Sequence, residues 1–229
     1  MFLLNFRDKQ SYKLSLLIPA FLVSSWAIFL LVYRIFEFPN QQDRALATLF
    51  YFTTQSNILI WFVLLLGFTK FAHHKWVQYL AFIALIDILI TGIVFHVFLA
   101  SFLDQIELMQ HVLHTVVPIT YLLFYTLTIK QKLPIRKFYI ALIHPLIFLI
   151  SVYLFIEPIF GDILNVIYPD LESARYVYPF LDPVYYELKI LGLIGFISLV
   201  LTPFICLISI ASISFIQVYH KYLERKQFE

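Results

Sequence analysis

Residues 46–68, with the sequence LATLFYFTTQSNILIWFVLLLGF, form an apolar run that is interrupted by five consecutive polar residues, Thr53 to Asn57. The run is close to the length of about 20 residues that an α-helix needs to cross the hydrocarbon core of a bilayer. Polar side chains at membrane depth are costly, and they usually face the protein interior or a water-filled cavity. The stretch therefore predicts a membrane-spanning helix that turns a polar face inward.

The composition extends this interpretation to the whole chain. The 229 residues are 62% hydrophobic and 13% charged, and the mean hydropathy is +0.87. Soluble domains are usually near half apolar and about a quarter charged. We expect an all-α bundle of six transmembrane helices, which forms a single integral-membrane domain over residues 1–229. The predicted spans are 14–36, 46–68, 77–101, 108–129, 138–156 and 190–218.

Charge and cysteine content exclude several function classes. The net charge of +2 gives no basic footprint for nucleic acid. The single cysteine, Cys206, rules out an internal disulfide or a thiolate metal cage. Pro203, inside the last apolar run, predicts a kink there.

The charged residues are distributed unevenly between the two sides of the predicted bundle. With a cytoplasmic N-terminus, twelve of the sixteen Lys and Arg residues lie on that side: Arg7, Lys9, Lys13, Lys70, Lys75, Lys130, Lys132, Arg136, Lys137, Lys221, Arg225 and Lys226. The positive-inside rule then places both termini in the cytoplasm. The outer loop 157–188 is long enough to be a functional lid or an interfacial aromatic belt.

A second polar cluster begins the predicted fourth helix, at His111 and His114. In this topology Thr53 and His114 each lie about six or seven residues, roughly 10 Å, below the outer end of their helices. His96, which shares a face of the third helix with Gly92, falls in the same slab of the membrane. We therefore expect the two polar clusters to meet.

Three chemistries fit such a cluster. A hydroxyl activated by an imidazole could attack an acyl carbonyl, with Gln55, Ser56 and Asn57 as donors to the developing oxyanion. His96, His111 and His114 could instead hold a zinc ion. Transport is the third possibility, with Asp87 at mid-membrane in a proton pathway. Asp87 could instead be a structural tether to the polar residues of the second helix.

Three short segments together resemble the androgen-induced gene family of membrane proteins, and more closely its bacterial branch, the Pr-six-Pr membrane proteins. The segments are Tyr51-Phe52-Thr53, His111-x-x-His114-Thr115-Val116-Val117-Pro118 and Val177-Tyr178-Pro179-Phe180-Leu181-Asp182. The resemblance runs from the second helix to the start of the sixth. It implies a bacterial cytoplasmic-membrane protein, and animal members are multi-pass hydrolases of fatty-acid esters of hydroxy fatty acids.

The resemblance implies a role for each matching residue. Thr53 would be the nucleophile and His114 its general base, with His111 or His96 as an orienting group, although a one-residue shift would make Thr54 the nucleophile. Tyr178, Phe180 and Asp182, in the third of these segments, would line an acyl-chain cavity. The substrate would be a membrane lipid or another fatty-acyl ester, and this mechanism needs no cofactor or metal. A metal-dependent hydrolase and a non-enzymatic lipid-binding or transport protein are the alternatives.

Overall fold

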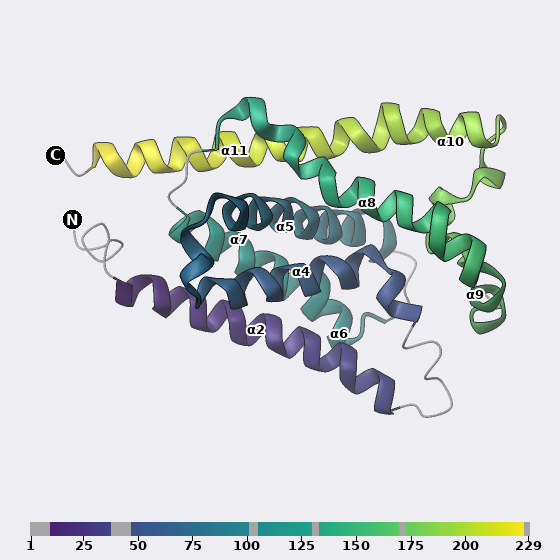
Figure 1. The fold of residues 1–229 in the computed structure, drawn as a ribbon, viewed down its shortest axis with the longest axis horizontal. Coiled ribbons are helices and arrows are strands. Elements are labelled where there is room, and N and C mark those ends of the chain that lie inside the picture. The colour runs from purple at the N-terminus through teal and green to yellow at the C-terminus, as the bar shows by residue number, and fades with distance from the viewer. Residues whose placement is uncertain (1–9, 38–46, 101–104, 130–132, 170–172, 227–229) are drawn as a thin grey trace.

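The computed structural model describes residues 10–37, 47–100, 105–129, 133–169 and 173–226, and helices make up nearly all of these ranges. The chain is an all-α bundle, as predicted (Figure 1). The α-helices are α2 (Gln10–Glu37), α4 (Phe52–Gly67), α5 (Lys75–Val94), α6 (Leu108–His111), α7 (Val117–Thr128), α8 (Ile143–Ser151), α9 (Gly161–Ile167), α10 (Ile190–Phe196) and α11 (Thr202–Arg225).

Several of these helices are joined end to end by π-helical turns. The joining turns are η6 (Val112–Val116), η8 (Val152–Phe160) and η12 (Ile197–Leu201), and a further π-helical turn, η4 (Phe95–Leu99), extends the end of α5. The remaining short elements are 3₁₀-helical: η2 (Thr48–Phe50), η3 (Lys70–His73), η7 (Ile135–Leu142), η9 (Ala174–Tyr176), η10 (Pro179–Leu181) and η11 (Pro183–Tyr185).

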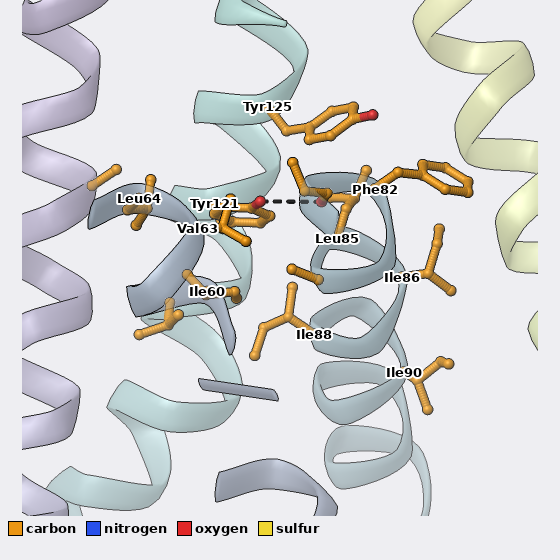
Figure 2. Packing of buried hydrophobic residues seen from close by; sticks show 14 of the residues in the cluster. Ile60, Val63, Leu64, Phe82, Leu85, Ile86, Ile88, Ile90, Tyr121 and Tyr125 are labelled. Atoms are coloured by element: carbon orange, nitrogen blue, oxygen red, sulfur yellow. Dashed lines mark hydrogen bonds between the residues drawn. The ribbon is translucent and has the colours of Figure 1, made fainter. Parts of the chain in front are cut away.

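Helix α5 is the centre of the bundle. It packs against α4, α7 and α11, and α4 lies between α5 and α2 (Figure 1). All residues from Ala81 to Ile88 are buried. Small side chains such as Ala81 and Ala84 let neighbouring helices approach closely, which favours packing in a membrane. Figure 2 shows this core, in which the Tyr121 hydroxyl donates to the Ala81 carbonyl at 3.1 Å.

Five helical segments in the described ranges are long and apolar enough to cross a membrane, so the chain is a multi-pass membrane protein. They are Lys13–Arg34, Lys75–Phe98, Leu108–Thr128, Ile135–Ile167 and Ile190–Arg225. The sixth helix, α4, has only 16 residues. The predicted second span started too early, because the backbone of Tyr51 is extended (φ −74°, ψ 138°) and the helix begins at Phe52.

The predicted outer loop also started too early. The sequence placed its beginning at residue 157, but the fifth helical segment continues to Ile167. Pro158 lies inside the π-helical segment η8, where the altered hydrogen bonding accommodates a residue without an N–H group. The loop therefore begins after Ile167 and ends at Lys189, and within it residues 170–172 lie outside the described ranges.

The last helix runs from α10 through η12 into α11. Pro203 is the second residue of α11, and the π-helical turn ends two residues earlier at Leu201, so the departure from regular α-helix lies just before the proline. The start of α2 and the end of α11 lie at the same end of the bundle (Figure 1). Arg7, Lys9, Lys130 and Lys132 lie outside the described ranges, as do position 46 at the start of the second predicted span and position 101 at the end of the third.

Candidate functional site

Thr53 lies in the first turn of α4 and not deep inside a helix as the sequence had predicted. The extended backbone at Tyr51 prevents the helix from starting earlier. Backbone N–H groups in the first turn of a helix have no partner within the helix. In this turn the Phe52 N–H finds its partner in the loop, at the Tyr178 hydroxyl 3.1 Å away.

The structure brings Thr53 and His114 together. The Thr53 Oγ1 and His114 Nε2 atoms are 3.3 Å apart, and His114 Nδ1 lies 2.9 Å from the carbonyl oxygen of Gln110. A carbonyl oxygen can only accept a hydrogen bond, so Nδ1 carries the proton. In the neutral ring, Nε2 is then free to accept the hydrogen bond of the Thr53 hydroxyl.

The π-helical turn η6 and the proline after it shape the backbone at His114. The N–H of Val117 donates to the carbonyl of Val112, so the Leu113 carbonyl loses its usual helical partner. Asn57 Nδ2 lies 3.4 Å from that Leu113 oxygen and 2.8 Å from the Thr53 carbonyl. The Asn57 side-chain amide thus connects α4, which carries Thr53, to η6, which carries His114.

Helix α5 holds the other side of this turn. The His114 ring stacks on the Phe95 ring with centroids 4.0 Å apart and 16° between planes. One turn earlier, Gly92 faces the His114 carbonyl, and a Cβ atom at this position would lie 3.1 Å from that oxygen. In a regular helix the N–H of residue 118 would donate to the His114 carbonyl, but Pro118 has no N–H group. Glycine therefore permits the close approach that sets the position of His114.

A cavity of about 80 Å³ opens beside the Thr53–His114 pair. Its walls are mostly apolar, and they come from α4, α5, η6, α8, the loop before α10, and the junction of η12 with α11. The lining residues are Phe52, Thr53, Ile90, Thr91, Val94, His114, Pro145, Phe148, Leu149, Tyr178, Phe180, Leu181, Leu201 and Ile205. Thr53 lines this cavity, whereas its neighbour Thr54 is buried with 3% of its surface exposed and is not one of the lining residues.

The other polar residues of α4 bond to backbone. Gln55 Nε2 donates to the Leu49 carbonyl at 3.3 Å, and Ser56 Oγ donates to the Phe52 carbonyl at 2.8 Å. The Nδ2 group of Asn57 donates to the Thr53 and Leu113 carbonyls, as described above. These hydrogen bonds stabilise the start of α4. None of the three side chains lines the cavity, so none of them offers it a hydrogen-bond donor.

His96 and His111 do not take the orienting role that the resemblance implied. His96 Nε2 pairs with Thr115 Oγ1 at 2.8 Å, and His111 is exposed. The Gln110 carbonyl orients His114 instead. Within the described ranges, no three His, Cys, Asp or Glu side chains are arranged to hold a metal ion.

Asp87 lies outside the cavity and is fully buried. Its Oδ2 atom is 2.8 Å from Nδ1 of His144 on α8. The predicted tether therefore runs to the fifth helical segment and not to the polar residues of α4. The His144 ring in turn stacks on Phe52, with centroids 5.2 Å apart.

The loop residues divide into two groups. Tyr178 and Phe180 line the cavity beside the Thr53–His114 pair. Asp182 does not, because its carboxylate accepts hydrogen bonds from Ser173 Oγ at 2.5 Å and from the Val184 N–H at 2.9 Å. Asp182 thus holds the shape of the loop.

Sequence reasoning missed three contributors to the site: the Gln110 carbonyl, the Phe95 ring and the bond from the Phe52 N–H to the Tyr178 hydroxyl at 3.1 Å. A backbone acceptor and an apolar ring leave no motif in a sequence. The spacing of Gln110 four residues before His114 is compatible with the observed bond, but this spacing is common to every helix.

Comparison of the chain with family models, with curated proteins and with solved structures gives no match. The likeness of its three motifs to the androgen-induced gene family therefore stays a resemblance. What the structure itself shows is a multi-pass membrane protein with a threonine–histidine pair at the edge of a small apolar cavity.

Proposed function

We propose that this protein is a membrane-embedded threonine hydrolase that cleaves fatty-acyl esters of membrane lipids. The observation that carries the proposal is the 3.3 Å contact between Thr53 Oγ1 and the Nε2 atom of a histidine whose Nδ1 proton is fixed on a carbonyl. A hydroxyl beside a correctly protonated imidazole is the arrangement of an activated nucleophile. The resemblance to the androgen-induced gene family supports the same two residues.

In the first step, Thr53 Oγ1 attacks the acyl carbonyl carbon while its proton passes to His114 Nε2. The tetrahedral intermediate then collapses, the bond from the carbonyl carbon to the leaving alkoxide breaks, and the alkoxide takes the proton from His114. In the second step, water attacks the acyl-threonine ester and gives its proton to His114. Collapse of this intermediate releases the fatty acid and returns the proton to Thr53 Oγ1.

The surroundings of the pair favour an apolar ester over a water-soluble one. Apolar side chains from five parts of the chain line the cavity, and Val94, Leu149 and Leu201 in its wall are partly exposed. The cavity is small, so we infer that the acyl chain continues along these partly exposed side chains. Thr91 also lines the cavity, and its buried Oγ1 atom has no hydrogen-bond partner among the described residues.

We further propose that the protein lies in a bacterial cytoplasmic membrane with both termini in the cytoplasm. The uneven distribution of Lys and Arg supports this orientation. The Thr53–His114 pair would then lie in the outer leaflet, near the depth at which lipid ester groups are found.

The test is covalent labelling of the purified full-length protein with a fluorophosphonate probe, together with hydrolysis of a chromogenic fatty-acyl ester. Thr53→Ala and His114→Ala are expected to abolish both signals, because each removes one member of the pair. Thr53→Ser keeps the hydroxyl and should retain measurable labelling.

Thr54→Ala is the matched control, because Thr54 is adjacent in sequence but does not line the cavity. It should label and hydrolyse like the wild type. Labelling that persists in Thr53→Ala but disappears in Thr54→Ala would move the nucleophile by one residue. Labelling and hydrolysis that are unaffected by all three alanine variants would overturn the proposal.

A further inference from the structure

The loop that carries Tyr178 has a strained backbone directly before this residue. Val177 has φ 69° and ψ −42°, and the N–H of Tyr178 donates to the Tyr176 carbonyl at 2.8 Å, so three residues form a γ-turn with positive φ. A positive φ is rare for a β-branched residue. Such strain persists only where the surrounding structure enforces it, and it is concentrated at functional sites.

Polar contacts on both sides of Val177 enforce this conformation. On one side, Arg175 is anchored to Glu157 by a 2.6 Å ion pair. On the other, Tyr153 and Tyr186 donate through their hydroxyls to the carbonyls of Leu181 and Phe180, at 2.5 and 2.7 Å. The strained turn is therefore held at each end.

The result of this geometry is that the Tyr178 side chain enters the site. Its ring stacks on Phe180 with centroids 5.1 Å apart and meets Tyr51 edge to face at 5.6 Å. Its hydroxyl accepts the Phe52 N–H at 3.1 Å and interacts with the side chain and backbone amide of Thr53. The hydroxyl is thus next to the oxygen that would attack the substrate.

The Tyr178 hydroxyl remains protonated at neutral pH. Burial raises the pKa of Tyr178 to about 12, although the backbone N–H groups of Thr53 and Phe52 favour the ionised form. The oxygen accepts the Phe52 N–H. Because the Thr53 hydroxyl donates to His114, the Tyr178 O–H is the donor in its contact with Thr53 Oγ1.

From this geometry we infer that Tyr178 is a third catalytic residue, which donates a hydrogen bond to the oxyanion of the tetrahedral intermediate. This inference rests on the proposed function. The oxyanion and Thr53 Oγ1 are bonded to the same carbon atom in that intermediate, so a donor next to Oγ1 is also within reach of the oxyanion. Tyr178 keeps its proton throughout and only strengthens its hydrogen bond as charge develops.

The experiment compares Tyr178→Phe with Tyr186→Phe in the full-length protein reconstituted in vesicles. Tyr178→Phe keeps the stacked ring and removes only the oxygen, and we expect kcat for the chromogenic ester to fall about 10²- to 10³-fold with little change in KM. Tyr186→Phe removes a hydroxyl that holds the loop through the Phe180 carbonyl. It therefore reports the effect of loosening the loop alone, and kcat should fall less than about tenfold, far less than in Tyr178→Phe.

A second readout separates catalysis from loop structure. A trifluoromethyl ketone forms a tetrahedral adduct with the nucleophile, whereas the matching fatty amide binds without reaction. In Tyr178→Phe, the affinity for the ketone should fall by the same factor as kcat, whereas the affinity for the amide should not change. If Tyr178→Phe proves poorly folded, 3-fluorotyrosine in its place keeps the hydroxyl but makes it more acidic, and the alkaline limb of the kcat profile should move to lower pH.

Wild-type kcat in Tyr178→Phe, or a rise in KM alone, would overturn the role of Tyr178 and leave the Thr53–His114 mechanism standing. An unshifted pH profile in the fluorotyrosine protein would do the same. Full activity in Thr53→Ala would instead overturn the proposed function and this inference together.

Discussion

His114 and His144 occupy two similar regions of the molecule. Each histidine lies in a membrane helix, stacks on a phenylalanine ring and uses Nδ1 for a polar contact. The partners differ. His114 Nδ1 bonds to a neutral backbone carbonyl, whereas His144 Nδ1 lies against the carboxylate of Asp87.

The difference decides what each imidazole can do with a proton. A carbonyl cannot take the Nδ1 proton, so a second proton that arrives at His114 Nε2 stays there until a leaving group removes it. Asp87 and His144 can share one proton between them. Their atoms are 2.8 Å apart, yet neither carboxylate oxygen makes a well-aligned hydrogen bond within the described ranges. His114 is thus suited to catalysis, and the His144 pair is suited to joining α5 and α8.

The largest predicted effect comes from replacing the two histidines in turn. His114→Gln should lower kcat for the chromogenic ester about 10²- to 10⁴-fold, because the general base is lost, and should leave the melting temperature close to wild type. His144→Gln should do the reverse. It leaves buried Asp87 without its partner at a cost of about 3 kcal/mol, while kcat per folded molecule falls less than tenfold.

Thermal unfolding in detergent and kcat normalised to the folded fraction measure both quantities. Equal losses of activity in the two variants would remove the functional distinction between the histidines. A melting temperature that is unchanged in His144→Gln would contradict the structural role of the Asp87 contact.

A smaller effect is expected from Gly92→Ala, which perturbs the His114 region alone. The new Cβ atom would lie 3.1 Å from the His114 carbonyl, so the turn must move by a few tenths of an ångström. We expect kcat to fall about tenfold because the base is displaced. Stability should change little, because alanine gains about 1 kcal/mol of helix propensity over glycine.

Gly195→Ala provides the matched control for Gly92→Ala. No atom lies within 4 Å of a Cβ built at Gly195, so this variant should keep full activity. If both glycine variants lose activity equally, the close approach of α5 to His114 has no catalytic importance.

The smallest effect is predicted for Thr115→Val, which removes the partner of His96 without changing side-chain shape. The His96–Thr115 bond is exposed and does not include Thr53. Initial-rate measurements should give kcat within about twofold of wild type. A loss in kcat greater than tenfold would show that His96 is an orienting residue, and His114 would then not depend on the Gln110 carbonyl alone.

The sequence was sufficient for the fold class and for the expectation that the polar clusters of Thr53 and His114 meet. Hydropathy reports which residues prefer lipid, and the topology expected from it predicted both side chains near the same end of the bundle. Hydropathy does not report backbone conformation. The extended Tyr51, which starts α4 at Phe52, and the continuation of the helix past Pro158 could therefore not be predicted.

The composition of the site was predictable only in part. The motif residues Thr53, His114, Tyr178 and Phe180 all line the cavity. Asp182 belongs to the same motif, but its carboxylate bonds within the loop, because the γ-turn at Val177 sets which side chains point inward. That turn depends on contacts with Glu157 and Tyr153, which are distant in sequence.

The four π-helical turns have a consequence for how the molecule can change over evolutionary time. Each extra residue in a helix rotates everything beyond it by about 100°. At Val112–Val116, Val152–Phe160 and Ile197–Leu201, the helix after the turn therefore presents its side chains at a different angle from the helix before it. Insertion or deletion of one residue at such a turn would redirect a side chain such as His114 while the packing of α5 with α4 stayed intact. Chemistry and scaffold can thus diverge separately within a single bundle.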